Sequence, residues 1–459
     1  MRRALLITAA LLPLAGCNLA PHAATPALPT PQQWPQGAAY GPLEEGSPAL
    51  PWRQVAGDAR LVKVIEMALS SSRSLREQVA ALAEARAQYH IQRAALLPTV
   101  DASASGSVTR GIANQANNAD SYSVSAGASS FEIDLFGRLR NEAKASFESY
   151  LASQSGLKST RLSLVSDVAT AWLTYAADKD TLTAAEGTLD SARKTLELER
   201  GLFKSGLASG SDVASAIATV EGAASDVAAD ITTLAQDRNA LDLLVGAHVA
   251  DELLPDTLDG LDHAISAPPA GLPSEVLRQR PDVVEAEHTL KGTYATIGAA
   301  RAAFFPAITL TSSVGLASTA LSQLFTHGAA QWNVAPSASV PLLGGTTGAN
   351  LAYAKAQRDY ALAAYELAVQ TAFRDVANAL ARRGTIADQR AAQDKQMLAY
   401  RRAWELADGQ RRAGTGTYLA ALVAQRSYYS AQQTRITAQL ADLSNRFTLY
   451  AAVGADPSL

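Results

Sequence analysis

The second half of the chain repeats the first half at a constant offset of 208 residues. Pro98 and Pro306 both follow an Arg-Ala-Ala motif, and that offset separates them. Glycines continue the correspondence to the ends of the two halves: Gly137 with Gly345, Gly206 with Gly414, and Gly246 with Gly454. Glycine and proline are each only a few per cent of an average protein, so a series of matches at one offset is not a chance alignment. The two halves therefore carry the same elements in the same order.

The proline distribution separates an extended N-terminal arm from two long segments that can be helical. Nine of the 19 prolines fall within the first 51 residues, and none lies in residues 99–254 or 342–456. Because proline cannot continue a helix, residues 17–57 are expected to form an extended arm. The net charge of −4, without a dense basic patch, argues against nucleic acid as a partner.

The N-terminus has the pattern of an export signal. Arg2 and Arg3 precede an apolar stretch at 4–12 that is too short to span a bilayer. The following Leu-Ala-Gly-Cys17 resembles the bacterial lipoprotein signal, which implies that residues 1–16 are removed and that the Cys17 thiol accepts a diacylglyceryl group. Asn18, rather than Asp, follows it, and this favours sorting to the outer membrane. Cys17 is the only cysteine, so no internal disulfide can form. The alternative is an ordinary secreted protein with a stray thiol.

Four segments alternate between apolar and small polar residues, as strands with one apolar face do. The alternation predicts strands at 99–110, 121–136, 307–318 and 331–342. Each is long enough for a tilted strand across a hydrocarbon layer. The apolar phase slips by one near Phe131, which predicts a β-bulge. A soluble β-sandwich is the alternative, but four strands are few beside so much helix.

Four strands cannot enclose a lumen, because membrane barrels start at about eight strands. An open sheet edge in lipid would leave backbone groups without hydrogen-bond partners, which is costly. Strands in a membrane would therefore require several copies to share one barrel. Three chains with twelve strands are the simplest symmetric closure, so the sequence predicts a homotrimer.

Long helices are expected after each pair of strands. Residues 139–245 predict a long helical hairpin, 347–453 predict its repeat, and shorter helices are expected at 58–96 and 281–303. The first long helix carries a seven-residue apolar repeat, typical of a coiled-coil seam: Val168, Tyr175, Leu182, Leu189, Leu196 and Phe203. Glycine-containing turns at 203–211 and 412–417 connect each long helix to its return helix.

Several motifs make the chain similar to the TolC-like outer-membrane efflux channels, particularly the lipoprotein branch that works with resistance-nodulation-division pumps. The most specific stretch is 272–282 (Leu-Pro-Ser-Glu-Val-Leu-Arg-Gln-Arg-Pro-Asp), and the segments 134–138 (Asp-Leu-Phe-Gly-Arg) and 424–426 (Ala-Gln-Arg) are also typical. The resemblance implies a mainly helical homotrimer whose 12-strand outer-membrane β-barrel continues into a 12-helix periplasmic α-barrel. It further implies a first channel repeat at 58–250, a linker at 251–272 and a second repeat at 273–459. The arm, the linker and the C-terminus would form an equatorial collar.

The resemblance also implies functional positions at the two turns. They would be docking sites for a periplasmic adaptor protein: Gly206, Leu207, Ala208, Ser209, Gly414, Thr415, Gly416 and Thr417. Members of the family hold the closed tunnel end with polar links, which implies a periplasmic gate formed by Asp212 with Arg411 and Arg412. The alternative is that these charges face solvent. In the best-known members aspartates ring this end, but the second-half positions here hold Ala420 and Val423, which leaves an acidic constriction in doubt.

The sequence carries no pattern typical of catalysis, metal binding or cofactor binding. The six histidines show no metal-ligand spacing: His22, His90, His248, His263, His288 and His327. Gly414-x-Gly416 lacks the third glycine and the preceding strand of a nucleotide loop, and no Gly-x-Ser-x-Gly elbow occurs. The chain is therefore expected not to be an enzyme and to need no cofactor or metal.

The favoured function is a passive outer-membrane exit duct for small toxic compounds and antibiotics. An inner-membrane resistance-nodulation-division pump would drive export through a periplasmic adaptor. A duct for type I protein secretion has the same architecture and is the alternative. A structural filament or adhesin with coiled-coil stalks is a third class, which would conduct no ions.

Overall fold

The computed structural model describes residues 18–22, 29–31, 33–41, 51–111, 119–266, 274–326, 328–454, 456 and 458–459. These residues fall into two compact units. One unit combines Ala81–Gln154 and Glu285–Glu366 with the N-terminal segment, and it contains the β-sheet. The other combines Leu28–Ala80, Ser155–Val284 and Leu367–Leu459. Each unit takes segments from both halves of the chain, so the two repeats are interleaved.

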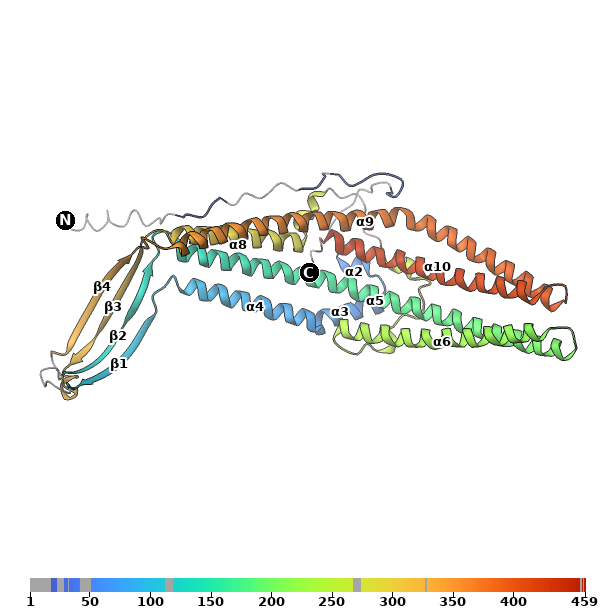
Figure 1. Ribbon diagram of the computed structural model, residues 1–459, viewed down its shortest axis with the longest axis horizontal. Coiled ribbons are helices and arrows are strands. Elements are labelled where there is room, and N and C mark those ends of the chain that lie inside the picture. The colour runs from blue at the N-terminus through green and yellow to red at the C-terminus, as the bar shows by residue number, and fades with distance from the viewer. Residues whose placement is uncertain are drawn as a thin grey trace. The chain divides into compact units, whose positions relative to one another are not determined.

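The sheet has four antiparallel strands in the order β1-β2-β3-β4 (Figure 1). Their bounds are Val100–Thr109 for β1, Ala119–Ile133 for β2, Ala307–Ser318 for β3 and Ala330–Ser339 for β4. The central pair joins β2 of the first half to β3 of the second half. Among the described strands, β1 and β4 form the two edges. The prediction of four strands per chain is confirmed.

A β-bulge interrupts the pairing of β2 with β3. The register shifts between Ala128 and Phe131, and Ser130 has a positive φ of 53°. The Ser130 backbone N–H donates to the Thr311 hydroxyl at 3.1 Å. The bulge that the apolar phase slip predicts near Phe131 is therefore confirmed. Regular pairing resumes after it, with Phe131 opposite Leu310.

The rest of the described chain is mainly helical, as predicted. The helices are α2 Trp52–Val55, α3 Ala59–Ser71, α4 Arg73–Ala94, α5 Arg138–Lys204, α6 Gly210–Val245, α7 Leu261–Ala264, α8 Pro281–Ala302, α9 Gly345–Arg412 and α10 Tyr418–Val453. Short 3₁₀ turns are η2 Asp251–Leu253, η3 Ser274–Gln279 and η4 Leu321–Gln323. In the described part of the chain, no helix has both the length and the apolar character that crossing a membrane requires.

The helix expected at 58–96 is broken into α3 and α4 at Ser72, whose ψ of 132° leaves the helical region. The break makes room for the end of α6. Gly246, with φ of 76°, lies so close that a Cβ there would be 2.5 Å from the Ser71 carbonyl oxygen. In the second half the equivalent Gly454 packs against Arg280, immediately before α8 begins at Pro281. The break at Ser72 in the first half therefore corresponds to the start of α8 in the second half, but Arg73 stands where the second half has Pro281.

The apolar seam of α5 is buried over most of its length. Val168 is fully buried and Leu189 nearly so, whereas Phe203, the last residue of the pattern, is 52 % exposed. Close to the turn, Leu196 belongs to a cluster with Ala216 of α6 and Tyr418 of α10. The seam therefore ties the two hairpins together up to Leu196 and then stops.

Candidate functional site

The two long hairpins end in turns with the same backbone geometry. After α5, Gly206 adopts φ of 73°, its N–H donates to the Phe203 carbonyl at 3.0 Å, and Leu207 N–H donates to Leu202 at 2.8 Å. After α9, Gly414 adopts φ of 74° with the equivalent bonds from Gly414 to Arg411 and from Thr415 to Gln410. This is the Schellman pattern, in which a left-handed glycine satisfies the last carbonyls of a helix.

Each return helix starts with a side-chain cap. The Ser209 hydroxyl accepts from Asp212 N–H at 3.1 Å, and the Asp212 carboxylate accepts from Ser209 N–H at 3.0 Å, which completes a capping box. On α10, Thr417 accepts from Ala420 N–H at 3.2 Å, without the reciprocal carboxylate. The hydrogen bonds from Ser209, and then the positive charge of Arg411, lower the pKa of Asp212.

The turn residues predicted to contact a partner are mostly exposed. Six of the eight are exposed, while Ala208 and Gly416 are half-buried. Two exposed residues in this region are large and apolar: Leu207, one of the eight, is 73 % exposed, and Leu419, at the start of α10, is 67 % exposed. The turns therefore combine accessible backbone at glycines with exposed leucines, a composition suited to contact with another protein.

A buried ion pair joins the two hairpins immediately behind the turns. Arg411 of α9 donates from Nε to Glu199 Oε1 of α5 at 2.8 Å, and its Nη2 also contacts Oε2. The Glu199 side chain has no exposed surface, and Arg411 is 12 % exposed. Glu199 lies three residues after Leu196, a position that the heptad pattern would assign to the apolar seam. A charged residue at a seam position is the sequence signal of this pair, and the periodicity of the apolar residues alone does not reveal it.

The three residues predicted for the gate have partners within the protomer. Asp212 binds Ser209, Arg411 binds Glu199, and Arg412 pairs with Asp408 one turn earlier at 2.7 Å. Asp212 and Arg411 interact through their charges. Their role in closing the end of the channel stays a prediction, now with Glu199 as the direct partner of Arg411.

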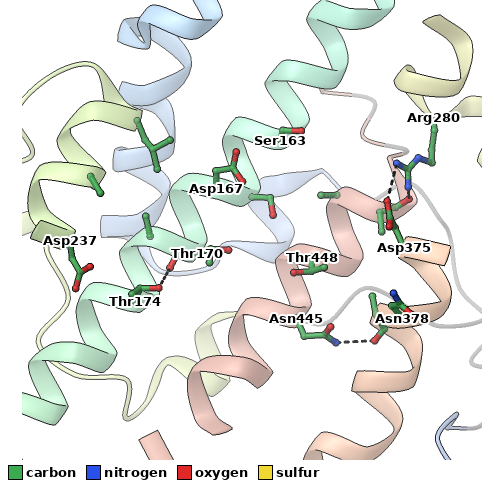
Figure 2. A pocket seen from close by; sticks show the side chains of 17 residues that line it. Ser163, Asp167, Thr170, Thr174, Asp237, Arg280, Asp375, Asn378, Asn445 and Thr448 are labelled. Atoms are coloured by element: carbon green, nitrogen blue, oxygen red, sulfur yellow. Dashed lines mark hydrogen bonds and ion pairs between the residues drawn. The ribbon is translucent and has the colours of Figure 1, made fainter. Parts of the chain in front are cut away.

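A hollow of about 900 Å³ lies among α5, α6, α9 and α10, open to solvent, and its wall mixes polar side chains with alanines and Leu244 (Figure 2). Hydroxyl, amide and carboxylate side chains dominate the labelled part of its wall: Ser163, Asp167, Thr170, Thr174, Asp237, Asp375, Asn378, Asn445 and Thr448. Arg280 also lines it, but its guanidinium is held by Asp282 at 2.6 Å and by the Ala452 carbonyl. The wall offers hydrogen bonds to water or passing solutes, and it lacks the enclosed apolar shape of a small-molecule site.

Two carboxyl groups meet beside the hollow, on α5 and α6. Burial raises the pKa of Asp178 to about 7, and the hydrogen bond and charge of Asp237 and the charge of Asp230 act in the same direction. Like charges this close cannot both ionise easily, so the pair holds a proton near neutral pH. Burial also raises the pKa of Asp167 on the wall of the hollow.

Other predicted positions fall outside these regions. Cys17 lies outside the described residues, as does His327. Within the residues described, no group of three or more His, Cys, Asp or Glu side chains could hold a metal ion. Two of the described histidines each contact one carboxylate instead: His288 contacts Glu148 and His248 contacts Asp242, both at 2.8 Å.

Comparison with known proteins identifies the same duplication. The family model described as "Outer membrane efflux protein" matches residues 64–247 and again residues 272–455, starting positions that differ by the repeat offset. The chain is 40 % identical over 451 residues to the toluene efflux pump outer membrane protein TtgC of Pseudomonas putida, covering 96 % of this chain and 93 % of that protein. It is equally similar to the antibiotic efflux pump outer membrane protein ArpC of Pseudomonas putida, with the same coverage. The crystal structure of the open state of the MtrE outer membrane channel of Neisseria gonorrhoeae matches with a TM-score of 0.85 and 36 % identity, over 96 % of this chain and 99 % of that one.

Proposed function

Because the chain belongs to the outer membrane efflux protein family, we propose that it is the exit duct through which a resistance-nodulation-division pump expels small toxic molecules. The single observation that carries this function is the double family match, which spans the sheet, both long hairpins and both turns. Two relatives are named for toluene and antibiotic efflux. Small aromatic solvents and antibiotics are therefore the cargo classes we assign to this channel.

The hollow among α5, α6, α9 and α10 supports a passive role for the protein. It is open to solvent, and its wall mixes alanines and Leu244 with short hydroxyl and amide groups and carboxylates such as Asp167 and Asp237. Such an open, mixed wall lacks the enclosed apolar shape that holds a small molecule tightly. The family is one of channels rather than enzymes, and the energy for export comes from the inner-membrane partner.

The assembly that we propose is a homotrimer in the outer membrane. One protomer contributes four strands with β1 and β4 as edges. In lipid those edges need partners, because unpaired backbone groups there are costly. Pairing β1 of one copy with β4 of the next closes twelve strands around a lumen, which is above the minimum of about eight.

The membrane attachment that we propose adds an acyl anchor at Cys17. The supporting observations are the export signal and the small residues that precede this single cysteine. Several acyl chains on one residue give stable membrane binding, whereas one chain gives only marginal binding.

The proposed contact with the periplasmic adaptor lies at the two turns. Gly206 and Gly414 leave the backbone accessible, and exposed leucines lie nearby: Leu207 follows Gly206, and Leu419 lies in the first turn of α10. Two similar turns on each protomer would give six equivalent contacts in a trimer. The proposed gate lies directly behind them, where the Glu199–Arg411 pair ties α5 to α9.

Complementation tests the proposed function. The gene is expressed in a strain that lacks its own efflux channel but keeps the pump and adaptor, and the accumulation of toluene and of an antibiotic is measured. The proposal predicts that accumulation falls when the gene is present while the set of secreted proteins is unchanged. Restored protein secretion with unchanged accumulation would instead indicate the type I secretion duct.

A further inference from the structure

The segment that follows Cys17 lies against α8 in the unit that contains the sheet. The Arg301 Nη1 donates to the Leu19 carbonyl oxygen at 3.1 Å. Ala20 packs on Gly298, one helical turn earlier on α8, and its N–H donates to the Asn18 side chain at 3.1 Å. Two consecutive residues of the segment are thus fixed to α8, one by a charged hydrogen bond and the other by close packing.

Gly298 is needed for this contact because no side chain fits at its position. A Cβ there would lie 2.8 Å from both the Cα and the Cβ of Ala20, and 2.8 Å from Nδ2 of Asn141 on α5. Asn141 is 3 % exposed and donates to the Gly137 carbonyl at 2.7 Å, so it cannot move away cheaply. A larger residue at position 298 would have to displace the N-terminal segment.

The first half of the chain shows that the helix itself does not require this glycine. At the repeat offset, Gly298 corresponds to His90 and Arg301 to Arg93, both on α4. His90 and Arg93 are exposed, whereas Gly298 is buried and Arg301 is half-buried. Two equivalent helices thus differ where one of them receives the N-terminal segment.

We propose that Gly298 and Arg301 form a docking site for residues Asn18–Ala20. This docking fixes the point of attachment of the acyl anchor beside α8. The proposal rests on the proposed acylation of Cys17, one residue before the docked segment. A flexible arm of the roughly 35 residues between Cys17 and α2 would let the anchor range over about 30 Å. Docking removes that freedom, and it holds the anchor on the helix that leads directly into β3, a strand assigned to the membrane.

Thiol accessibility at position 20 tests the docking. Ala20→Cys is introduced into the full-length protein in outer membranes, and the rate of maleimide modification is followed by peptide mass spectrometry. We expect slow modification relative to the protein in denaturant. Adding Arg301→Ala should raise the rate about tenfold, because a hydrogen bond from a charged donor contributes about 1.4 kcal/mol or more, and that energy is tenfold in an opening equilibrium. Gly298→His should have at least the same effect.

Two matched variants serve as controls. Arg93→Ala removes the repeat-equivalent arginine, and Gly348→His places the same side chain on α9 where nothing lies within 4 Å. Both should leave the rate unchanged. Fast modification of the Ala20→Cys protein without a second substitution would overturn the docking site. Equal effects of Arg301→Ala and Arg93→Ala would overturn it as well. Mass spectrometry of Cys17 reports acylation separately, so a chain without acyl groups would refute the anchor whether or not the segment is docked.

Discussion

Glu199 and Arg411 form a two-point ion pair between α5 and α9, and the carboxylate has no exposed surface. The pair lies immediately behind both turns, so separating the hairpins at their tips requires breaking it. Such a pair costs desolvation energy, and we expect its role here to be specifying one arrangement of the two hairpins.

Loss of this pair should open the channel. We expect Arg411→Ala to raise the open probability in planar bilayers about tenfold, because a shift of about 1.4 kcal/mol suffices and a broken buried pair is worth at least that. Glu199→Gln should act in the same direction, and Asp212→Ala more weakly, since Asp212 acts on Arg411 only through its charge.

Arg401→Ala is the matched control for the gate. Arg401 lies on α9 like Arg411, but it pairs with Glu405 on its own helix and is 56 % exposed, so its loss should leave conductance unchanged. If Arg411→Ala and Arg401→Ala conduct alike, the ion pair does not hold the channel shut. If Asp212→Ala leaves conductance at the parental value, Asp212 has no part in the gate.

A charge at the tip should weaken adaptor binding. Leu207 is mostly exposed at the first turn, and Leu207→Asp should raise the Kd for the purified adaptor about tenfold or more by placing a charge in an apolar contact. Ile231→Asp alters an exposed apolar residue of α6 outside the turn and should leave the Kd unchanged. Equal affinities of the Leu207→Asp variant and the parent would place the docking surface elsewhere.

The shared proton of Asp178 should make stability depend on pH. Its pKa is raised to about 7 in the folded chain, so between about pH 4 and pH 7 the folded state holds a proton that the unfolded state has lost. Stability therefore falls as pH rises through this window, and the penalty is complete above it. Asn mimics the protonated acid, so Asp178→Asn should raise the Tm at pH 8 and change it little at pH 4.

Asp190→Asn provides the comparison for that pH dependence. Asp190 lies on the same helix, but it is exposed and pairs with Lys194. Its replacement should shift Tm by a small amount that is similar at both pH values. A Tm gain for Asp178→Asn that is the same at pH 4 and pH 8 would contradict the shared proton.

Acylation predicts a specific mass for the mature protein. The intact mass should equal that of residues 17–459 plus a diacylglyceryl group and a further acyl chain, and Cys17→Ser should remove this addition. The variant should still insert and assemble, because the strands rather than the anchor span the membrane. A parent protein that keeps residues 1–16, or that carries no lipid mass, would refute the anchor.

Much of the fold could be predicted because its signals are local or repeated. The strands follow from alternation, the bulge from a phase slip near Phe131, and the turn positions from Gly206 and Gly414, which need a left-handed backbone. The repeat offset then doubles the information, since each element is seen twice. The seam of α5 was predictable up to Leu196 because its apolar residues recur locally, every seven positions.

The remaining features depend on contacts between distant segments. Glu199 and Arg411 are 212 residues apart, and they have no counterparts at the repeat offset, where Ala407 and Phe203 stand. The break at Ser72 lies where Gly246 at the end of α6 approaches the Ser71 carbonyl oxygen, and the serines at 70–72 do not reveal that contact. The Asp178–Asp237 contact likewise needs the packing of α5 on α6. Sequence periodicity predicts elements well, but it does not predict which polar side chains meet across them.

The mass of the detergent-solubilised protein, measured by light scattering with the detergent contribution subtracted, tests the central claim most directly. The account predicts three times the mass of one mature chain, together with ion conductance in planar bilayers, because one chain supplies only four of the strands that a closed wall needs. A stable species with the mass of a single chain that passes no current would contradict it.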